Sequence, residues 1–313
     1  MSSRITILSS FTRDLIVSNK NGKYVEKLGG PAFYVSVVFE SLGTNYSIMT
    51  SSSNRIFTMI SYMYPEIASR IRSIYSCDSD FVFMHKYIST GIRESKLISR
   101  GCDLLIDLDL LARNEWLVIS PVLGEISIEM VRKIAKRVGA ISLDVQGFIR
   151  KSDIGESIIN KPTKILGLEN IDNIKIIHAS YEELLDLNKD PEDLAVELIS
   201  RIRSPITSLT MGRQGSFLGL YRRGSGEAEL YYIPAYIQNA DMEDPTGCGD
   251  IYLAALTYYI ASNKDPVDAG LLASIIAGIR VYEGIPLNID PDRLSSIYND
   301  LKKSIRKIGV YKI

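Results

Sequence analysis

Short apolar runs alternate with longer amphipathic segments along most of the 313 residues. Such runs are typical of buried strands, and strands separated by helices build a mostly parallel sheet that is covered on both faces. The pattern therefore predicts an α/β fold in a single domain over residues 1–313. The expected strands are 5–8, 46–50, 116–120, 140–145, 174–178, 206–211, 217–221 and 228–233, and the expected helices are 32–42, 128–138, 191–202, 249–261, 267–282 and 291–308.

Two segments interrupt this alternation. Residues 15–28 contain two strand-like runs around Asn21-Gly22, a dipeptide that is a strong signal for a hairpin turn. Residues 81–110 are also extended and partly strand-like. Lid segments at about 15–28 and 81–110 could form a small sheet over the end of the main sheet, where it would exclude water from a site. The same pattern fits ordinary edge strands equally well.

Composition narrows the partners and the compartment. With 36 basic and 37 acidic residues, the net charge of -1 gives no electrostatic footprint for nucleic acid. No apolar stretch is long enough for a membrane span, and the first 13 residues lack the apolar core of a signal peptide. The cysteines Cys77, Cys102 and Cys248 are scattered and odd in number, so a disulfide framework is not expected. His85 and His178 are too few for an all-histidine metal site. We therefore expect a cytoplasmic protein without nucleic-acid or membrane partners.

The segment that carries most chemistry lies where the helix at 249–261 must begin. Its glycines let an anion approach the backbone closely, and the free N–H groups of a helix start attract phosphate. Asp250, in the first helical turn, would lie beside that anion and could accept a proton from an attacking hydroxyl. The same residues also fit a plain glycine-rich turn with an acidic residue at the helix start. The segment is Asp244-Pro245-Thr246-Gly247-Cys248-Gly249-Asp250.

This segment resembles the C-terminal signature of the ribokinase-like, or phosphofructokinase-B, carbohydrate kinase family, whose usual form is Asp-Thr-x-Gly-Ala-Gly-Asp. The resemblance implies a three-layer α/β/α sandwich with a mostly parallel central sheet and a small β lid. It also implies that Asp250 is the catalytic base and that the amides of Gly247, Cys248 and Gly249 form an anion hole for the γ-phosphate. Cys248 stands where Ala is common, and we interpret it as a packing residue.

Other residues match family positions that bind a monovalent cation or the sugar. Asp244 and Thr246 match positions that help to hold a monovalent cation in some family members, which makes K⁺ a candidate cofactor. Gly29-Gly30 resembles the family's N-terminal glycine pair, which lets substrate approach the backbone and serves as a lid hinge. Asp14 matches the family aspartate that accepts hydrogen bonds from substrate hydroxyls. Alone, the glycine pair would be a simple turn and Asp14 a turn residue.

Two further elements resemble the nucleotide and metal elements of the family. Ser180 and Glu183 resemble its Asn-x-x-Glu element, which orders the Mg²⁺ shell through water, with Ser in place of Asn. This pair also fits a capping box at a helix start. Residues Thr210, Gly212 and Gly215 resemble the Thr-x-Gly-x-x-Gly loop that lines the nucleotide, although such loops are also common as plain turns.

One element is similar to the inositol kinase branch of the family. Asp144, Gln146 and Arg150 follow an expected strand with the spacing Asp-x-Gln-x-x-x-Arg, and Gln146 and Arg150 are candidate substrate ligands. Arg150 could contact nucleotide phosphate or substrate oxygen, or form an ordinary salt bridge. The Asn that ribose kinases carry shortly after the glycine pair is absent, and Tyr34 occupies that region.

These elements together predict a kinase that uses ATP and Mg²⁺ to phosphorylate a hydroxyl of a small-molecule sugar or polyol, with myo-inositol or a related polyol as the best guess. A pentose or nucleoside kinase is the alternative. A sugar- or nucleotide-binding sensor with the same fold but no chemistry is the alternative from another class. The chain has neither a Walker A motif nor a Gly-x-Gly-x-x-Gly after its first strand, which disfavours a P-loop kinase and a dinucleotide enzyme. A homodimer through the lid is a further expectation.

Overall fold

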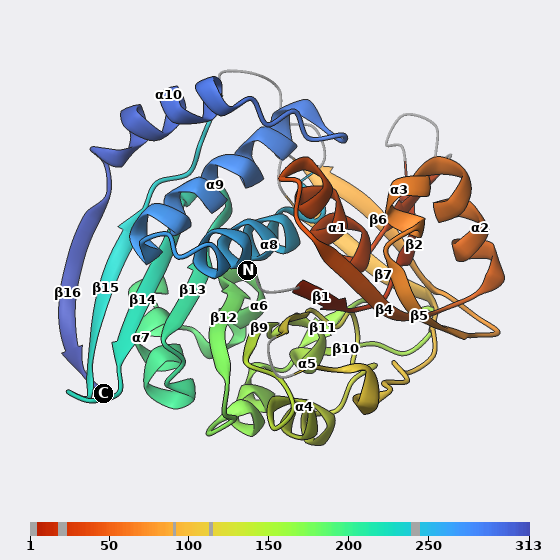
Figure 1. Ribbon diagram of the computed structural model, residues 1–313, viewed down its shortest axis with the longest axis horizontal. Helices are drawn as coiled ribbons and strands as arrows, with labels where there is room; N and C mark the ends of the chain where they lie inside the picture. The colour runs from red at the N-terminus through yellow and green to blue at the C-terminus, as the bar shows by residue number, and fades with distance from the viewer. Residues whose placement is uncertain (1–4, 18–23, 90–91, 113–114, 239–244) are drawn as a thin grey trace.

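The computed structural model describes residues 5–17, 24–89, 92–112, 115–238 and 245–313. Within these residues, a ten-stranded sheet forms the centre of the molecule (Figure 1). Strands from β5 to β13 run parallel, and the sheet continues through three antiparallel strands at the other edge. In spatial order the strands are β16 (Arg306–Lys312), β15 (Glu227–Ile233), β14 (Ser216–Arg222), β13 (Ile206–Thr210), β12 (Ile174–Ser180), β9 (Ala140–Asp144), β8 (Trp116–Ile119), β1 (Ile5–Leu8), β4 (Tyr46–Ser52) and β5 (Ile71–Ser76).

Helices cover both faces of this sheet, so its parallel strands are buried on both sides. One hydrophobic core joins the sheet to α1 (Pro31–Ser41), α8 (Cys248–Ala261), α9 (Pro266–Glu283) and α10 (Pro291–Lys302), with α2 (Asn54–Met63) and α3 (Pro65–Ala68) at its margin. The core on the opposite face includes α4 (Ile128–Ala135) and α7 (Pro191–Ile202), with the short α5 (Gln146–Ile149) and α6 (Tyr181–Leu184). The layers lie on either side of the sheet in Figure 1. The predicted α/β fold with a mostly parallel sheet is confirmed.

The predicted elements match these bounds closely, with differences at the edges of the sheet. The helix expected over 291–308 ends at Lys302, and β16 begins at Arg306. The residues of β16 are only partly buried, and its apolar and polar residues do not alternate clearly. Its strand structure comes from pairing with β15. The sequence also gave no expectation for α2 or β5.

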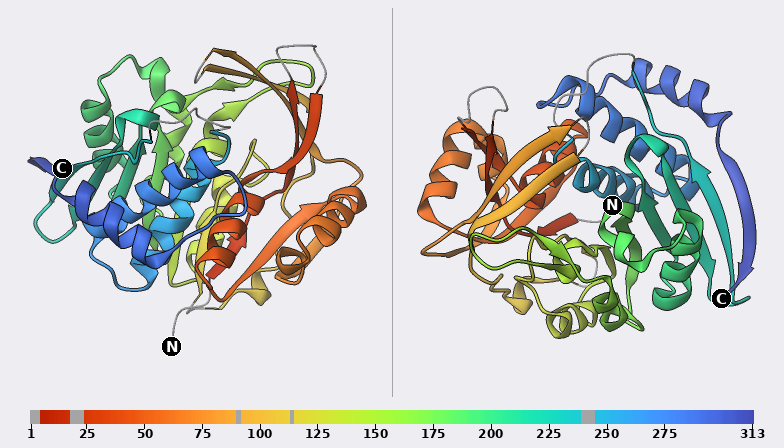
Figure 2. Two further views of the ribbon diagram at one scale, coloured as in Figure 1. Left: turned by 90° about the horizontal axis from the view of Figure 1, so that it is seen from above. Right: turned by 180° about the vertical axis from the view of Figure 1, so that it is seen from behind.

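A second sheet stands at one end of the main sheet (Figure 2). Its described strands are β3 (Tyr24–Gly29), β2 (Thr12–Val17), β6 (Phe81–Ser89) and β7 (Ile92–Ser99), in that order. The expected segments 15–28 and 81–110 thus meet in one sheet, which we call the lid, but the second contributes strands only as far as Ser99. The turn at Asn21-Gly22 lies outside the described residues.

The β7 edge of the lid is hydrogen-bonded to a segment that comes after β9, the fifth main-sheet strand along the chain. Leu97 of β7 accepts a hydrogen bond from the N–H of Gly155 at 2.7 Å and donates its own N–H to Glu156 at 3.0 Å, and Ser95 accepts from Ile158 at 3.0 Å. This segment connects β10 (Arg150–Lys151) to β11 (Ile159–Asn160). The lid therefore shares a wall with the residues that follow the end of β9.

Short 3₁₀ turns complete the connections between the elements. They are η1 (Leu108–Leu110), η2 (Pro162–Leu168), η3 (Leu185–Leu187) and η4 (Gly212–Gln214). None of the helices in the described ranges combines the length and the apolar character needed to cross a bilayer.

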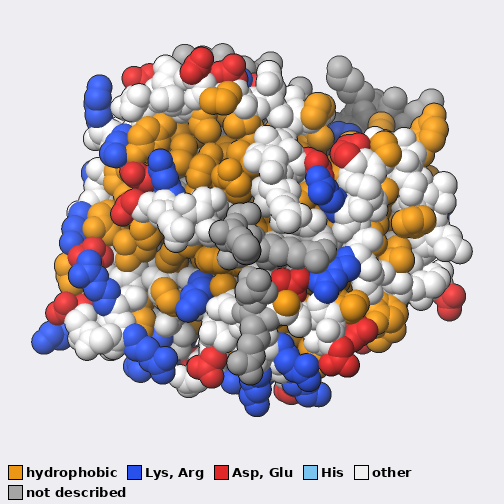
Figure 3. All heavy atoms as spheres, viewed as in Figure 1, with side chains coloured by type: hydrophobic (Ala, Val, Ile, Leu, Met, Phe, Trp, Pro, Cys, Tyr) orange, Lys and Arg blue, Asp and Glu red, His pale blue; other side chains and the backbone are white. Residues whose placement is uncertain are grey.

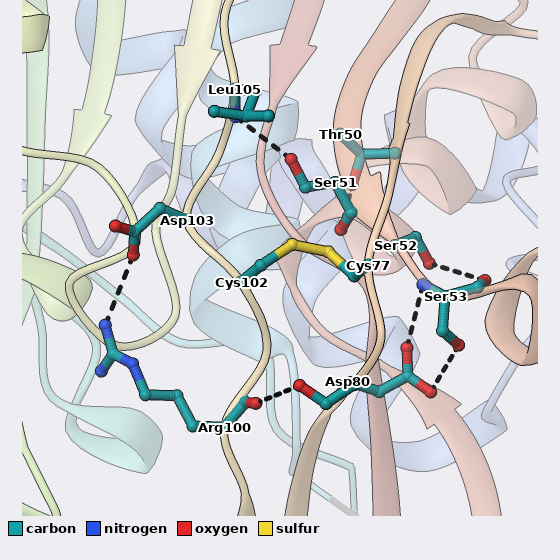
Figure 4. Close-up of a disulfide and its surroundings, with 11 residues drawn as sticks. Thr50, Ser51, Ser52, Ser53, Cys77, Asp80, Arg100, Cys102, Asp103 and Leu105 are labelled. Carbon is teal, nitrogen blue, oxygen red and sulfur yellow. Dashed lines mark hydrogen bonds and ion pairs between the residues drawn. A yellow bond between two sulfur atoms is a disulfide. The ribbon is translucent and has the colours of Figure 1, made fainter.

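Cys77 and Cys102 form a disulfide, so the expectation of no disulfide is wrong (Figure 4). Cys77 follows β5, and Cys102 follows β7, so the bond joins the edge of the main sheet to the end of the lid. Spacing along the chain does not reveal this contact, because the two strands belong to different sheets. Because disulfides are rare in the cytosol, the cysteines no longer support the expected cytoplasmic location. Next to the bond, the N–H and hydroxyl of Ser53 donate to the Asp80 carboxylate at 3.2 and 2.8 Å.

We expect the disulfide to stabilise the protein measurably. It closes a loop between residues 25 apart, and such a constraint on the unfolded chain contributes about 3 kcal/mol. The double variant Cys77→Ser/Cys102→Ser should lose about that much free energy of unfolding in urea titrations, whereas Cys248→Ala serves as the control. Denatured, unreduced wild type should show one titratable thiol among its three cysteines. Three thiols before reduction would contradict the bond.

Candidate active site

The carboxyl ends of β8, β9 and β12 meet the first turn of α8, which is where ligands bind in open parallel sheets. Gly247 is the N-cap of α8, with φ of +81°. A Cβ at this position would lie 2.4 Å from the Tyr34 ring of α1, so both the backbone angle and the close approach require glycine. The N–H of Cys248, the first residue of α8, donates to the Pro245 carbonyl at 3.2 Å. Because helix starts attract anions, this end of α8 is a candidate anion site.

Asp250 lies in the first turn of α8 and is 8% exposed. The hydroxyl of Ser120, directly after β8, donates to its Oδ1 at 3.1 Å. Burial, and next the negative charge of Asp144, raise the pKa of Asp250 to about 7. A carboxyl with that pKa can exchange a proton near neutral pH, which is what a general base requires.

A buried chain of polar groups runs behind this carboxyl. His178, in β12, lies with Nδ1 2.8 Å from the Asp144 carboxylate at the end of β9, and its Nε2 lies 3.4 Å from the Thr210 hydroxyl. Burial opposes charge on the ring, but Asp144 and its hydrogen bond raise the pKa of His178 above the usual value. A Cβ at Gly249 would lie 3.3 Å from the same ring. The His178 ring therefore packs directly against the start of α8.

Glu183 and Arg150 form a second charged pair at this edge. Arg150 Nη2 lies 3.3 Å from Oε1 of Glu183, and the Ser180 N–H donates to Oε2 at 3.1 Å. Burial and Asp144 raise the pKa of Glu183, while Arg150 opposes that rise. Ser180 and Glu183 thus hold part of a capping box at the start of α6. Both oxygens of Glu183 thus have a hydrogen-bonding partner at the edge of the sheet.

Between the sheet edge and the lid lies a cavity of about 300 Å³. Asp14 of β2 reaches its wall, and Thr12 donates to Asp14 Oδ1 at 2.8 Å. A Cβ at Gly29 would lie 2.1 Å from Asp14 Oδ2, and Gly30 adopts φ of +85° beside the Ser10 carbonyl. The glycine pair is therefore required by the packing of Asp14 and by the turn into α1.

The structure separates the predicted residues into those that line the cavity and those that do not. The lining residues are Asp14, Gly30, Gln146, Arg150, Glu183, Thr246, Gly247 and Asp250. The predicted residues that the structure describes but that do not line the cavity are Gly29, Ser180, Thr210, Gly212, Gly215, Cys248 and Gly249. Cys248 directs Sγ toward the Ala277 carbonyl of α9 at 3.8 Å. Asp244 lies outside the described residues.

Sequence reasoning missed several groups at this site. His178 and Ser120 contact predicted residues, and His85, Ser95 and Asn160 line the cavity. The alternation of β6 and β7 could have placed His85 and Ser95 on one face of the lid, because the two residues are paired across the strands. Nothing local in the sequence marks His178 as the partner of Asp144.

No family model matches the sequence. Inositol 3-kinase of Oryza sativa subsp. japonica is 25% identical over 320 residues, which cover 96% of this chain and 74% of that protein. A solved structure of a pyrophosphate-dependent kinase in the ribokinase family, complexed with a pyrophosphate analogue and myo-inositol, matches with a TM-score of 0.73 at 17% identity, over 96% of this chain and 99% of that one. Ribokinase from Thermotoga maritima matches with a TM-score of 0.66 at 16% identity, over 96% and 99% of the two chains.

The fold is therefore that of the ribokinase-family kinases, and the resemblance that the motifs indicated is confirmed. It extends over nearly the whole chain, and the curated relatives from Oryza sativa and Zea mays are inositol 3-kinases.

The raised pKa of Asp250 can be measured directly. In protein labelled with ¹³C at aspartate carboxyls, one resonance should titrate near pH 7 and disappear in Asp250→Asn. Because the Ser120 hydroxyl stabilises the ionised form, Ser120→Ala should move that midpoint to higher pH. A midpoint near the ordinary aspartate value of about 3.9, or a downward move in Ser120→Ala, would contradict this electrostatic account.

Proposed function

We propose that this chain is a carbohydrate kinase that transfers a phosphoryl group to a hydroxyl of a sugar or polyol, with myo-inositol or a related polyol as its acceptor. The observation that carries the proposal is the Asp250 carboxyl, buried at the start of α8 beside a polar cavity, with its pKa raised to about 7. The similarity to inositol 3-kinases over 96% of the chain supports the same class of acceptor.

In the proposed reaction, the acceptor hydroxyl lies in the cavity between Asp14 and Asp250. Asp250 accepts the hydroxyl proton as the oxygen attacks the terminal phosphorus of the donor, and the bond from that phosphorus to the donor's bridging oxygen breaks. The amides of Gly247, Cys248 and Gly249 stabilise the charge on the transferring group. His178 packs behind Gly249, and its contact with Asp144 raises its pKa, which favours a positive charge next to the same region. Catalysis then depends on positioning and charge stabilisation, as phosphoryl transfer requires.

ATP with Mg²⁺ is the donor that we propose, and the test below includes pyrophosphate because a similar structure depends on it. Over the described ranges, no three side chains of His, Cys, Asp or Glu are grouped to hold a metal directly. This fits Mg²⁺, which keeps several waters and is held by one or two carboxylates together with the donor's phosphates. Glu183 would hold it through water. Thr246 is our candidate ligand for K⁺, with Asp244 outside the described residues.

The cavity wall supports a hydroxyl-rich acceptor. Asp14 offers carboxylate oxygens, Gln146 an amide, and Arg150 a guanidinium. The Asn160 side-chain oxygen has no hydrogen-bond partner within the described part of the chain. A buried acceptor atom without a partner is costly unless a ligand supplies a donor. A sensor that binds such a ligand without chemistry remains the alternative from another class, and turnover decides between them.

Cytoplasmic location and a homodimer through the lid also stay predictions. Tyr24 and Val25 of β3 are 57% and 60% exposed, so this edge of the lid offers apolar surface for a second copy.

A screen of donor consumption over polyols, sugars and nucleosides, with ATP and pyrophosphate in parallel, tests the kinase. Asp250→Asn should keep the fold and donor binding but lose about 10²- to 10⁴-fold in kcat, because no other group takes the proton. Asp292→Asn, which changes an exposed carboxylate in α10, is the matched control. Near-normal turnover by Asp250→Asn would remove Asp250 as the base, and absence of any acceptor-dependent turnover in wild type would favour the sensor.

Asp14→Ala should weaken acceptor binding while donor affinity stays the same. A hydrogen bond from a hydroxyl to a buried carboxylate contributes about 1.5–3 kcal/mol, so the dissociation constant for the acceptor should rise by about 10- to 150-fold. Glu94→Ala, an exposed carboxylate on lid strand β7, controls for changes in lid charge. Calorimetry with each ligand separates the two affinities. A loss of donor binding with acceptor binding intact would place Asp14 outside the acceptor site.

A further inference from the structure

The inner face of the lid is apolar over most of its length and becomes polar at one place. Along β6, side chains at every second position share this face, and the rings of Phe81 and Phe83 stack with centroids 6.4 Å apart. Leu97 of β7 is buried against them. His85 continues the same row, with its ring 6.1 Å from that of Phe83, and it is 5% exposed.

His85 lies in a row of polar groups that crosses three neighbouring lid strands. Its Nδ1 lies 2.8 Å from the Ser95 hydroxyl of β7, which fixes the orientation of the ring. Its Nε2 lies 3.6 Å from Oδ1 of Asp14 on β2, a separation too long for a hydrogen bond between them. Thr12 donates to the same carboxylate oxygen. Each of these four side chains lines the cavity.

We propose that His85 and Asp14 together bind two adjacent hydroxyls of the acceptor, so that His85 determines specificity for a vicinal diol. This inference rests on the proposed function, because it concerns the acceptor of that reaction. Because the two protein atoms lie 3.6 Å apart, adjacent hydroxyls of one polyol ring can each reach one of them. One hydroxyl donates to Asp14, and its neighbour pairs with Nε2 of His85, while Ser95 is a positioning residue for the imidazole.

The surroundings of the pair support selection for the diol. Phe83 lies beside His85 on the cavity wall and offers an apolar surface to the C–H face of a ring, while the polar row meets its hydroxyl rim. Since both His85 and Asp14 are at most 5% exposed, water replaces a missing hydroxyl poorly. Sites built on such buried hydrogen bonds strongly reject analogues that lack the hydroxyl.

The test compares intact and deoxygenated acceptors in wild type and His85→Phe. Calorimetric affinities are measured without donor for myo-inositol, ribose and their monodeoxy analogues, and kcat/KM is measured for those that turn over. In wild type, removal of one particular hydroxyl should weaken binding by about 10- to 100-fold. In His85→Phe, which keeps the aromatic row, the intact acceptor should lose the same factor, and the analogue lacking that hydroxyl should change by less than about threefold. Ser95→Ala should give a smaller loss with the same dependence on that hydroxyl.

Lys96→Ala, on the exposed face of β7, is the control for the lid and should leave all affinities unchanged. An equal loss for every acceptor in His85→Phe would indicate a structural role and overturn the proposal, as would no loss. If wild type binds the polyols but transfers no phosphate, the kinase proposal fails and the pattern of affinities still decides the role of His85. If wild type binds none of them, the diol proposal is overturned as well.

Discussion

The carboxylates of Asp144, Glu183 and Asp250 are buried together at the edge of the sheet, and the site depends on how their charge is balanced. His178 compensates Asp144, and Arg150 compensates Glu183. Burial, and next the charge of Asp144, raise the pKa of Asp250 to about 7, and the Ser120 hydroxyl with the more distant Arg150 and His178 offsets that rise only in part. Ionisation of Asp250 in the folded protein therefore costs free energy. The folded protein retains a proton that the unfolded chain releases, and this contribution to stability falls as pH rises from about 4 to about 7.

The fold brings these groups together because parallel strands end at a common edge. β8, β9 and β12 deliver Ser120, Asp144 and His178 from neighbouring positions, and α8 begins in front of them. The lid adds its residues from two segments that precede β4 and follow β5 along the chain, and the disulfide joins the end of β5 to the residues after β7. The apolar helices α8 and α9 pack over one face of the sheet. A broad hydrophobic surface lies over α9, above and to the left of the centre of Figure 3. The main sheet and α8 thus hold the charged groups, and the lid covers the cavity.

Local patterns in the sequence sufficed to predict the alternation of strands and helices, the start of α8 and the candidate base Asp250. These features depend on residues close together in the chain, such as the glycines that directly precede Asp250. The reasons for two of the glycines are long-range, because a Cβ at Gly247 would strike Tyr34 and one at Gly29 would strike Asp14. The partners of buried polar groups could not be predicted in the same way. His178 finds Asp144 across two strands, and Cys77 finds Cys102 across two sheets, so only the three-dimensional topology reveals the contacts. The edge strand β16 was missed because its pattern is polar.

That edge strand has a consequence for how the protein is made. β16 pairs along the whole of β15, although synthesis of the chain reaches it only after α8, α9 and α10. Until then, β15 presents unpaired backbone groups to solvent at the border of a large sheet, and such edges recruit other strands. In a newly synthesised chain, the centre of the sheet around β1 can therefore form before β16 exists. During that stage the exposed edge of β15 can pair with a strand of another chain. The polar residues of β16 end that stage by covering the exposed border.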